Sequence, residues 1–128
     1  MGCVKEAYFL LSGVSSDQLA EVLLNMGGWG VNYFIEERRG GRWMYAFFRE
    51  VKRQDDYFLV KVGLREKDRW KWGEIFMVRL LEDGGGVRMV VRRVRGVGRI
   101  GSDLVGYWIV ENARKHYPDV LLEDGTSF

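Results

Sequence analysis

The fold is decided by the stretch EIFMVRLLEDGGGVRMVVRRVR, residues 74–95. Its two halves, residues 74–81 and 87–95, are rich in β-branched and other aliphatic residues, which is typical of β-strands. Asp83 and the three glycines that follow it allow a tight turn between two antiparallel strands. The stretch therefore predicts a β-hairpin.

The same pattern of short apolar segments and turn residues extends toward the N-terminus. Strands are predicted over residues 5–12, 31–37, 42–52 and 57–65. Residues 67–73 are predicted to form a polar loop, and residues 119–128 an irregular tail. The five consecutive strands between residues 31 and 95 indicate an antiparallel meander.

Two helices complete the pattern. The first begins after Ser15, whose side chain can form a capping box with Gln18, and it ends at the Gly27–Gly28 pair. The second begins with Ser102 or Asp103 as its cap and ends near His116. The element order is β-α-β5-α, so we predict a single α+β domain over residues 1–128, with the last helix covering one face of the sheet.

This order resembles that of the START-like (SRPBCC) helix-grip superfamily, and the resemblance extends over almost the whole chain. The resemblance implies a curved antiparallel β-sheet packed around a long C-terminal helix, with a cavity between them. It implies non-enzymatic binding of a small apolar or amphipathic ligand without a cofactor. Because some helix-grip proteins are enzymes, a cyclase- or hydrolase-like activity is an alternative.

The residues expected to line this cavity combine large apolar side chains with a few polar tips. They are Phe58, Phe76, Trp108, Tyr33, Tyr107 and Arg79.

Composition excludes several other classes of protein. The chain has 128 residues, of which 47% are hydrophobic and 30% are charged, as in one globular domain. The single cysteine, Cys3, cannot form an internal disulfide, and the single histidine, His116, excludes a multi-histidine metal site. No apolar run approaches the roughly 20 residues of a membrane-spanning helix. We therefore assign no catalytic residue, metal or membrane partner, and expect a cytoplasmic protein.

An uneven charge distribution indicates a second class of partner. The net charge is only +2, but residues 84–101 contain five arginines and no acidic residue. Arginines beside aromatic residues can contact phosphates and stack on bases. The predicted order also fits the half-repeat of TATA-binding proteins, whose curved sheet binds DNA. The alternative function is therefore a nucleic-acid interface formed by Arg88, Arg92, Arg95, Arg99, Trp70 and Trp72. A solvated strand face is the other interpretation of these arginines.

Residues 96–101, GVGRIG, have the spacing of a dinucleotide-binding fingerprint. That fingerprint belongs to a βαβ unit, whereas here the following helix is the last large element. We interpret the glycines as a sharp bend from sheet to helix. Arg99 and free N–H groups at the start of the helix form a weaker candidate anion site.

The strand over residues 42–52 is apolar on both faces. Trp43, Tyr45 and Phe47 alternate with three further apolar residues, Met44, Ala46 and Phe48. One face can meet the last helix, and the other needs a second layer, a ligand or a partner subunit. A homodimer is therefore one predicted way to cover that face.

Overall fold

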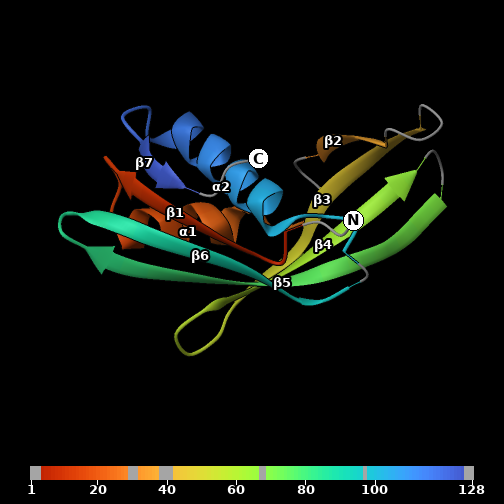
Figure 1. Ribbon diagram of the computed structural model, residues 1–128, viewed down its shortest axis with the longest axis horizontal. Helices are drawn as coiled ribbons and strands as arrows, with labels where there is room; N and C mark the ends of the chain where they lie inside the picture. The colour runs from red at the N-terminus through yellow and green to blue at the C-terminus, as the bar shows by residue number, and fades with distance from the viewer. Residues whose placement is uncertain (1–3, 29–31, 38–41, 67–68, 97, 126–128) are drawn as a thin grey trace.

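The computed structural model describes residues 4–28, 32–37, 42–66, 69–96 and 98–125. For residues 32–37, 42–44, 66 and 69–72, only the backbone is described. Within these ranges the element order is β1-α1-β2-β3-β4-β5-β6-α2-β7 (Figure 1). The elements span, in that order, Glu6–Ser12, Ser16–Met26, Asn32–Glu37, Arg42–Arg53, Phe58–Glu66, Arg69–Asp83, Gly86–Arg95, Ser102–His116 and Leu121–Gly125.

The strands form one antiparallel sheet in the order β2-β3-β4-β5-β6-β1-β7. The five strands of the predicted meander lie beside one another in chain order. β1 pairs with the free side of β6, where Phe9 lies opposite Met89. β7 pairs with the other side of β1. The fold is therefore α+β with an antiparallel sheet, as the sequence predicts.

Two segments that were expected to be irregular are strands. β5 begins at Arg69, and its first residues pair with the end of β4, so the predicted loop over residues 67–73 is wrong for residues 69–73, while residues 67 and 68 lie outside the described ranges. The charged residues around Trp70 favour a loop, and the bulge near Gly73 breaks the alternation between this part of β5 and the apolar residues that follow. Residues 121–125 form β7 and are all exposed, so no apolar period marks them either.

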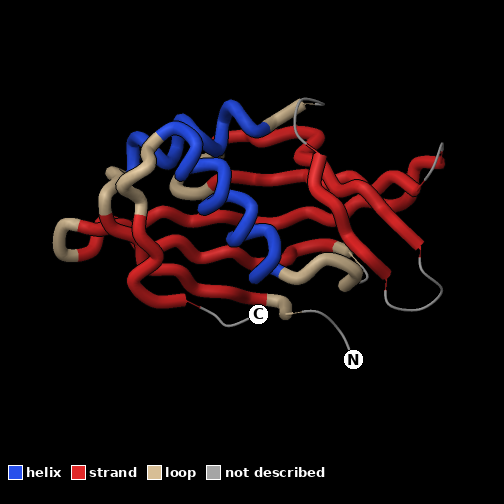
Figure 2. The backbone as a smooth tube through the Cα atoms, turned by 90° about the horizontal axis from the view of Figure 1, so that it is seen from above, coloured by secondary structure: helices blue, strands red, loops and turns tan. Residues whose placement is uncertain are grey.

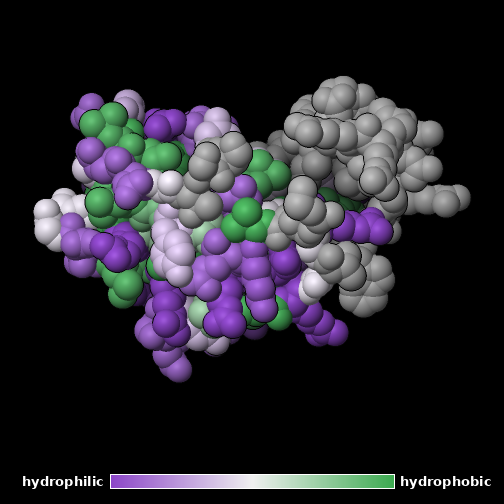
Figure 3. Space-filling view, in the orientation of Figure 1, coloured by the Kyte–Doolittle hydropathy of each residue, from purple (hydrophilic) through white to green (hydrophobic). Residues whose placement is uncertain are grey.

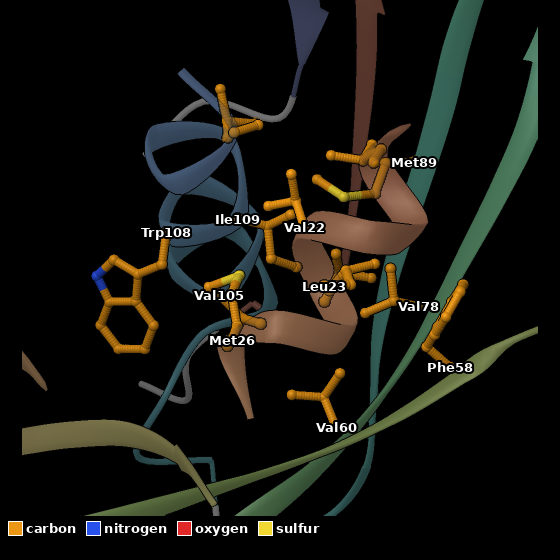
Figure 4. Packing of buried hydrophobic residues seen from close by; sticks show 14 of the residues in the cluster. Val22, Leu23, Met26, Phe58, Val60, Val78, Met89, Val105, Trp108 and Ile109 are labelled. Carbon is orange, nitrogen blue, oxygen red and sulfur yellow. The ribbon is translucent and has the colours of Figure 1, made fainter. Parts of the chain in front are cut away.

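Both helices lie on the same face of the sheet (Figure 2). Ser15 caps α1 as predicted: its hydroxyl accepts from the Gln18 N–H at 3.1 Å, and the Gln18 side chain accepts from the Ser15 N–H at 3.0 Å. Figure 4 shows the buried side chains that the two helices and the sheet bring together. The opposite face, here called the outer face, points downward in Figure 1, and neither α1 nor α2 lies on it.

α2 contacts β1, β6 and α1. A Cβ atom on Gly106 would lie 2.1 Å from Cε2 of Phe9, so the helix backbone lies directly against that ring. Trp108 meets Phe48 edge to face, with ring centroids 6.4 Å apart. Val105 and Ile109 are fully buried, and Leu104 is partly buried.

The start of α2 differs from the sequence-based expectation. Its N-cap is Gly101, and no side chain caps the helix. The Ser102 hydroxyl instead donates to the Lys5 carbonyl at 2.5 Å, and the Ser102 N–H donates to the Val4 carbonyl at 2.8 Å. These bonds attach the first turn of α2 to the chain that enters β1.

No helix in the described ranges is long and apolar enough to cross a membrane.

Candidate functional site

The side chains expected to line a cavity between sheet and helix lie in different places. Phe58, Phe76 and Trp108 are buried members of the hydrophobic cluster. Tyr107 is 39% exposed, and Arg79 is exposed on the outer face near Asp56. Tyr107 and Arg79 therefore do not point into the interior: Tyr107 lies on the solvent side of α2, and Arg79 alternates with the buried Val78. The side chain of Tyr33 lies outside the described residues.

The glycine-rich segment over residues 96–101 holds a carboxylate of the chain itself. Oε1 of Glu74 accepts from the N–H groups of Gly98 at 2.5 Å and Arg99 at 3.0 Å. Oε2 accepts from the N–H of Ile100 at 2.7 Å. Three converging backbone donors form a concave anion-binding site. The predicted anion site is thus occupied by Glu74, which is 2% exposed, so these N–H groups are not free for an external ligand.

The geometry of this segment depends on glycine and on a neighbouring arginine. Gly96 has φ +137°, and a Cβ atom there would lie 2.5 Å from Cγ of Glu74. The Arg93 guanidinium donates to the Ile100 carbonyl at 3.1 Å, so the segment is bound on its carbonyl side as well. The segment therefore makes the sharp bend from sheet to helix that the glycines predict.

Three β-bulges coincide in the sheet beside Glu74. They insert one extra residue in β3 at Arg49, one in β5 near Gly73 and one in β6 at Val94. Each bulge bends its strand and increases the local twist. The bulges cluster at one place in three neighbouring strands, and a pocket of about 610 Å³ opens there.

We call this space the bulge pocket. Its walls combine cationic side chains, apolar side chains and backbone. The described residues that line it are Arg49, Lys61, Val62, Gly73, Glu74, Ile75, Arg95 and Gly96.

Positive charge dominates the described wall of the bulge pocket. Lys61 Nζ lies 3.2 Å from Oε2 of Glu50, and this hydrogen bond, reinforced by the lysine charge, holds the pKa of the Glu50 carboxyl below its ordinary value. Within the described residues, neither Arg49 nor Arg95 forms a salt bridge. The carboxylate of Glu74 is bound to the loop N–H groups. Two exposed arginines therefore remain available to an anion at this pocket.

In the middle of β3, the described apolar side chains on both faces are buried within one chain. Ala46 and Phe48 belong to the cluster beneath the helices, whereas Phe47 lies over Gly63 on the outer face and is 1% exposed. Phe47 therefore gives no reason to invoke a partner subunit, and the homodimer stays a prediction. The side chains of Trp43 and Met44 lie outside the described residues.

The structure distributes the predicted nucleic-acid residues over several places. Arg88 and Arg92 lie on the outer face of β6, Arg95 lies at the bulge pocket, and Arg99 is exposed in the segment before α2. Trp70 and Trp72 are in β5, not in a loop, and their side chains are outside the described residues.

Sequence reasoning missed Arg49, Lys61 and Glu74. A signal existed for Glu74, because it shares the inward face of its strand with Phe76 and Val78, and a buried acid needs internal donors. No sequence signal marked the bulge at Arg49. In the described ranges, no three histidine, cysteine or acidic side chains are placed to hold a metal ion.

Comparison of the chain with protein-family models, with curated proteins and with solved structures finds no match.

Proposed function

We propose that this protein binds a small amphipathic organic anion in the bulge pocket. The observation that carries this proposal is the pair of exposed arginines, Arg49 and Arg95, at one pocket, neither of which forms a salt bridge within the described residues. Unlike lysine, arginine presents a planar fork of donors that matches a carboxylate, sulfonate or phosphate group. An anionic group is therefore the first requirement for the ligand.

The size of the pocket and its apolar wall support a second requirement, an apolar group on the ligand. Its volume of about 610 Å³ falls within the range of about 300–1,000 Å³ that small-molecule sites occupy. Ile75, which is half-buried, offers aliphatic surface beside the arginines, so an apolar group of the ligand can be removed from water there. A short-chain fatty carboxylate or an aromatic sulfonate has this combination of groups.

This proposal retains the amphipathic ligand that the helix-grip resemblance implies, and moves it to the bend of the sheet. The space beneath α2 is lined by large buried side chains such as Phe48, Phe76 and Trp108. A ligand there would have to displace well-packed core groups, at a cost in stability. The bulge pocket needs no such displacement.

A matched pair of fluorescent probes tests the proposal. The first probe is 8-anilinonaphthalene-1-sulfonate, and the second is N-phenyl-1-naphthylamine, which is the same aromatic amine without the sulfonate. We expect saturable binding of one sulfonate probe per chain and weaker binding of the neutral probe. Decanoate should displace the sulfonate probe, whereas decanol should not.

Variants at the two arginines locate the site. Loss of one charge-assisted hydrogen bond is worth about 1.5–3 kcal/mol, so Arg49→Gln or Arg95→Gln should weaken the sulfonate probe about 10- to 100-fold. The neutral probe should be unaffected. Arg114→Gln on α2, whose partner is Glu111 at 2.7 Å, removes the same charge elsewhere and is the control. Equal losses in all three variants, or no saturable binding, would refute the proposal.

A further inference from the structure

A second group of cationic side chains lies on the outer face, away from the bulge pocket. We define the outer strip as Tyr8 of β1, Arg79 of β5, and Arg88 and Arg92 of β6. The strand register places Tyr8 opposite Val90, and Val90 opposite Arg79. Arg88 and Arg92 flank Val90 on the same face of β6, so three arginines lie around the position of the tyrosine. Glu6 lies opposite Arg92 on this face, and its carboxylate accepts a hydrogen bond from the Tyr8 hydroxyl.

Burial confirms the direction of these side chains. The neighbours of Tyr8 along β1, Ala7 and Phe9, are buried beneath the helices, whereas Tyr8 is 53% exposed. In the same way, the exposed Arg88 alternates with the buried Val87 and Met89. In Figure 3, hydrophilic side chains gather along the lower half of the molecule with smaller hydrophobic patches between them. The outer face thus carries hydrophilic and apolar side chains together.

The ion pairs on the outer strip are weak. Arg88 donates to Asp83 at 2.7 Å, and Arg79 lies 4.0 Å from Asp56, but all four side chains are largely exposed. Exposed pairs of this kind contribute little, so a phosphate can replace the carboxylate. Within the described residues, Arg92 forms no salt bridge.

Two surface depressions accompany the outer strip. One of about 140 Å³ lies between Arg79 and Arg92, with Glu6, Met77 and Val90 in its wall. The other, of about 350 Å³, is lined by Tyr8, Leu10 and Arg88, together with Asp124 and Gly125 of β7. An extended chain that crosses the strip would therefore find hollows on both sides of the tyrosine.

We infer that the outer strip binds single-stranded nucleic acid, with the arginines on phosphates and a base on the Tyr8 ring. Open sheet faces that combine exposed aromatic rings with cations suit unpaired bases, because every base offers a face for stacking. A duplex hides those faces and offers the arginines its phosphates alone. Single strands should therefore bind more tightly than duplex of equal length. This inference does not depend on the bulge pocket.

Fluorescence anisotropy with labelled oligothymidylate and oligouridylate of about twelve nucleotides tests the inference. For three phosphate contacts, log Kd should change with log salt with a slope of about 2 in magnitude, since each contact on a single strand contributes about 0.7. Arg92→Gln should reduce that slope by about 0.7. Comparison of the affinities for the DNA and the RNA oligonucleotide shows whether the 2′-hydroxyl contributes to binding.

Variants of Tyr8 separate base stacking from simple charge attraction. Tyr8→Ala should weaken single-strand binding about 5- to 100-fold, and Tyr8→Phe, which keeps the ring, should restore it. Arg114→Gln on α2 and Arg49→Gln at the bulge pocket should leave affinity unchanged. Because Tyr8 and Arg92 are exposed, urea unfolding should report native stability for both variants.

Three results would overturn the inference: no binding at low salt, tighter binding of duplex than of single strand, or equal affinity of Tyr8→Ala and the parent chain. The last result would mean that the outer strip attracts polyanions by charge alone, without base stacking.

Discussion

Replacement of Glu74 by alanine should destabilise the protein more than any surface substitution. The carboxylate accepts three backbone hydrogen bonds, from Gly98, Arg99 and Ile100, at 2.5, 3.0 and 2.7 Å. In the alanine variant these donors lose their acceptor. A buried donor without a partner costs about 1–3 kcal/mol. The Ile100 bond is buried and the other two are part-buried, so water can rescue only some of the loss.

The summed effect for Glu74→Ala is about 3–5 kcal/mol of the free energy of unfolding. Glu74→Gln keeps one oxygen, which can still accept from Gly98 and Arg99, but it turns an NH₂ group toward the Ile100 N–H. Its cost should therefore be about 1–3 kcal/mol. For a domain of this size the alanine variant should melt roughly 10–20 °C lower than the parent chain.

Urea unfolding followed by far-UV circular dichroism and by tryptophan fluorescence measures both variants. Glu111→Ala is the control, because its partner Arg114 is an exposed neighbour on the same helix and such pairs contribute at most about 1 kcal/mol. If Glu74→Ala lies within about 1 kcal/mol of the parent chain, or if Glu74→Gln is the worse variant, the described hydrogen bonds do not hold the segment.

Three further predictions concern the helix packing and the lysine–glutamate pair. Trp108→Ala should lower the free energy of unfolding, measured in urea, by about 3–5 kcal/mol, because the ring is buried against Phe48. A loss below about 1 kcal/mol would contradict that burial. Gly106→Ala should lower the free energy of unfolding by about 1–3 kcal/mol, since the added methyl group would overlap the Phe9 ring. An unchanged midpoint of urea unfolding would show that α2 lies further from β1. NMR titration of Glu50 should give a midpoint below the ordinary value of 4.5, and Lys61→Gln should raise that midpoint. Because the folded-state pKa is the lower one, the contribution of this pair is present above about pH 4.5 and disappears as the pH falls through the folded-state pKa.

Local chemistry explains the elements that the sequence predicts well. The capping box of Ser15 and Gln18 defines the start of α1 without help from distant residues. Gly84 and Gly85 adopt φ values of +57° and +90°, which glycine reaches most readily. The glycines in the sequence therefore predict the β5–β6 turn. Five strands and both helices therefore lie within a residue or two of their predicted bounds.

The candidate site depends on information that the sequence does not contain. A β-bulge is a mismatch between two strands, and no single strand reveals it. Arg49, Lys61 and Arg95 come together only because β3, β4, β5 and β6 are neighbours with bulges at the same level. The partners of Glu74 are likewise contributed by the segment after β6, across the strand pairing. The prediction from sequence also had the wrong direction for the Arg79 side chain. Arg79 has an apolar residue on each side in β5, so the alternation of apolar and polar residues does not show which face of the strand is inward.

The measurement that tests the proposed function most directly is an NMR study of the protein saturated with decanoate, with isoleucine and valine methyl groups labelled. The bulge pocket predicts intermolecular NOEs from the decanoate chain to the methyl groups of Ile75, and their loss in Arg95→Gln at the same ligand concentration. NOEs to Ile109 and Val78 instead would place the ligand beneath α2, and would contradict the assignment of the pocket.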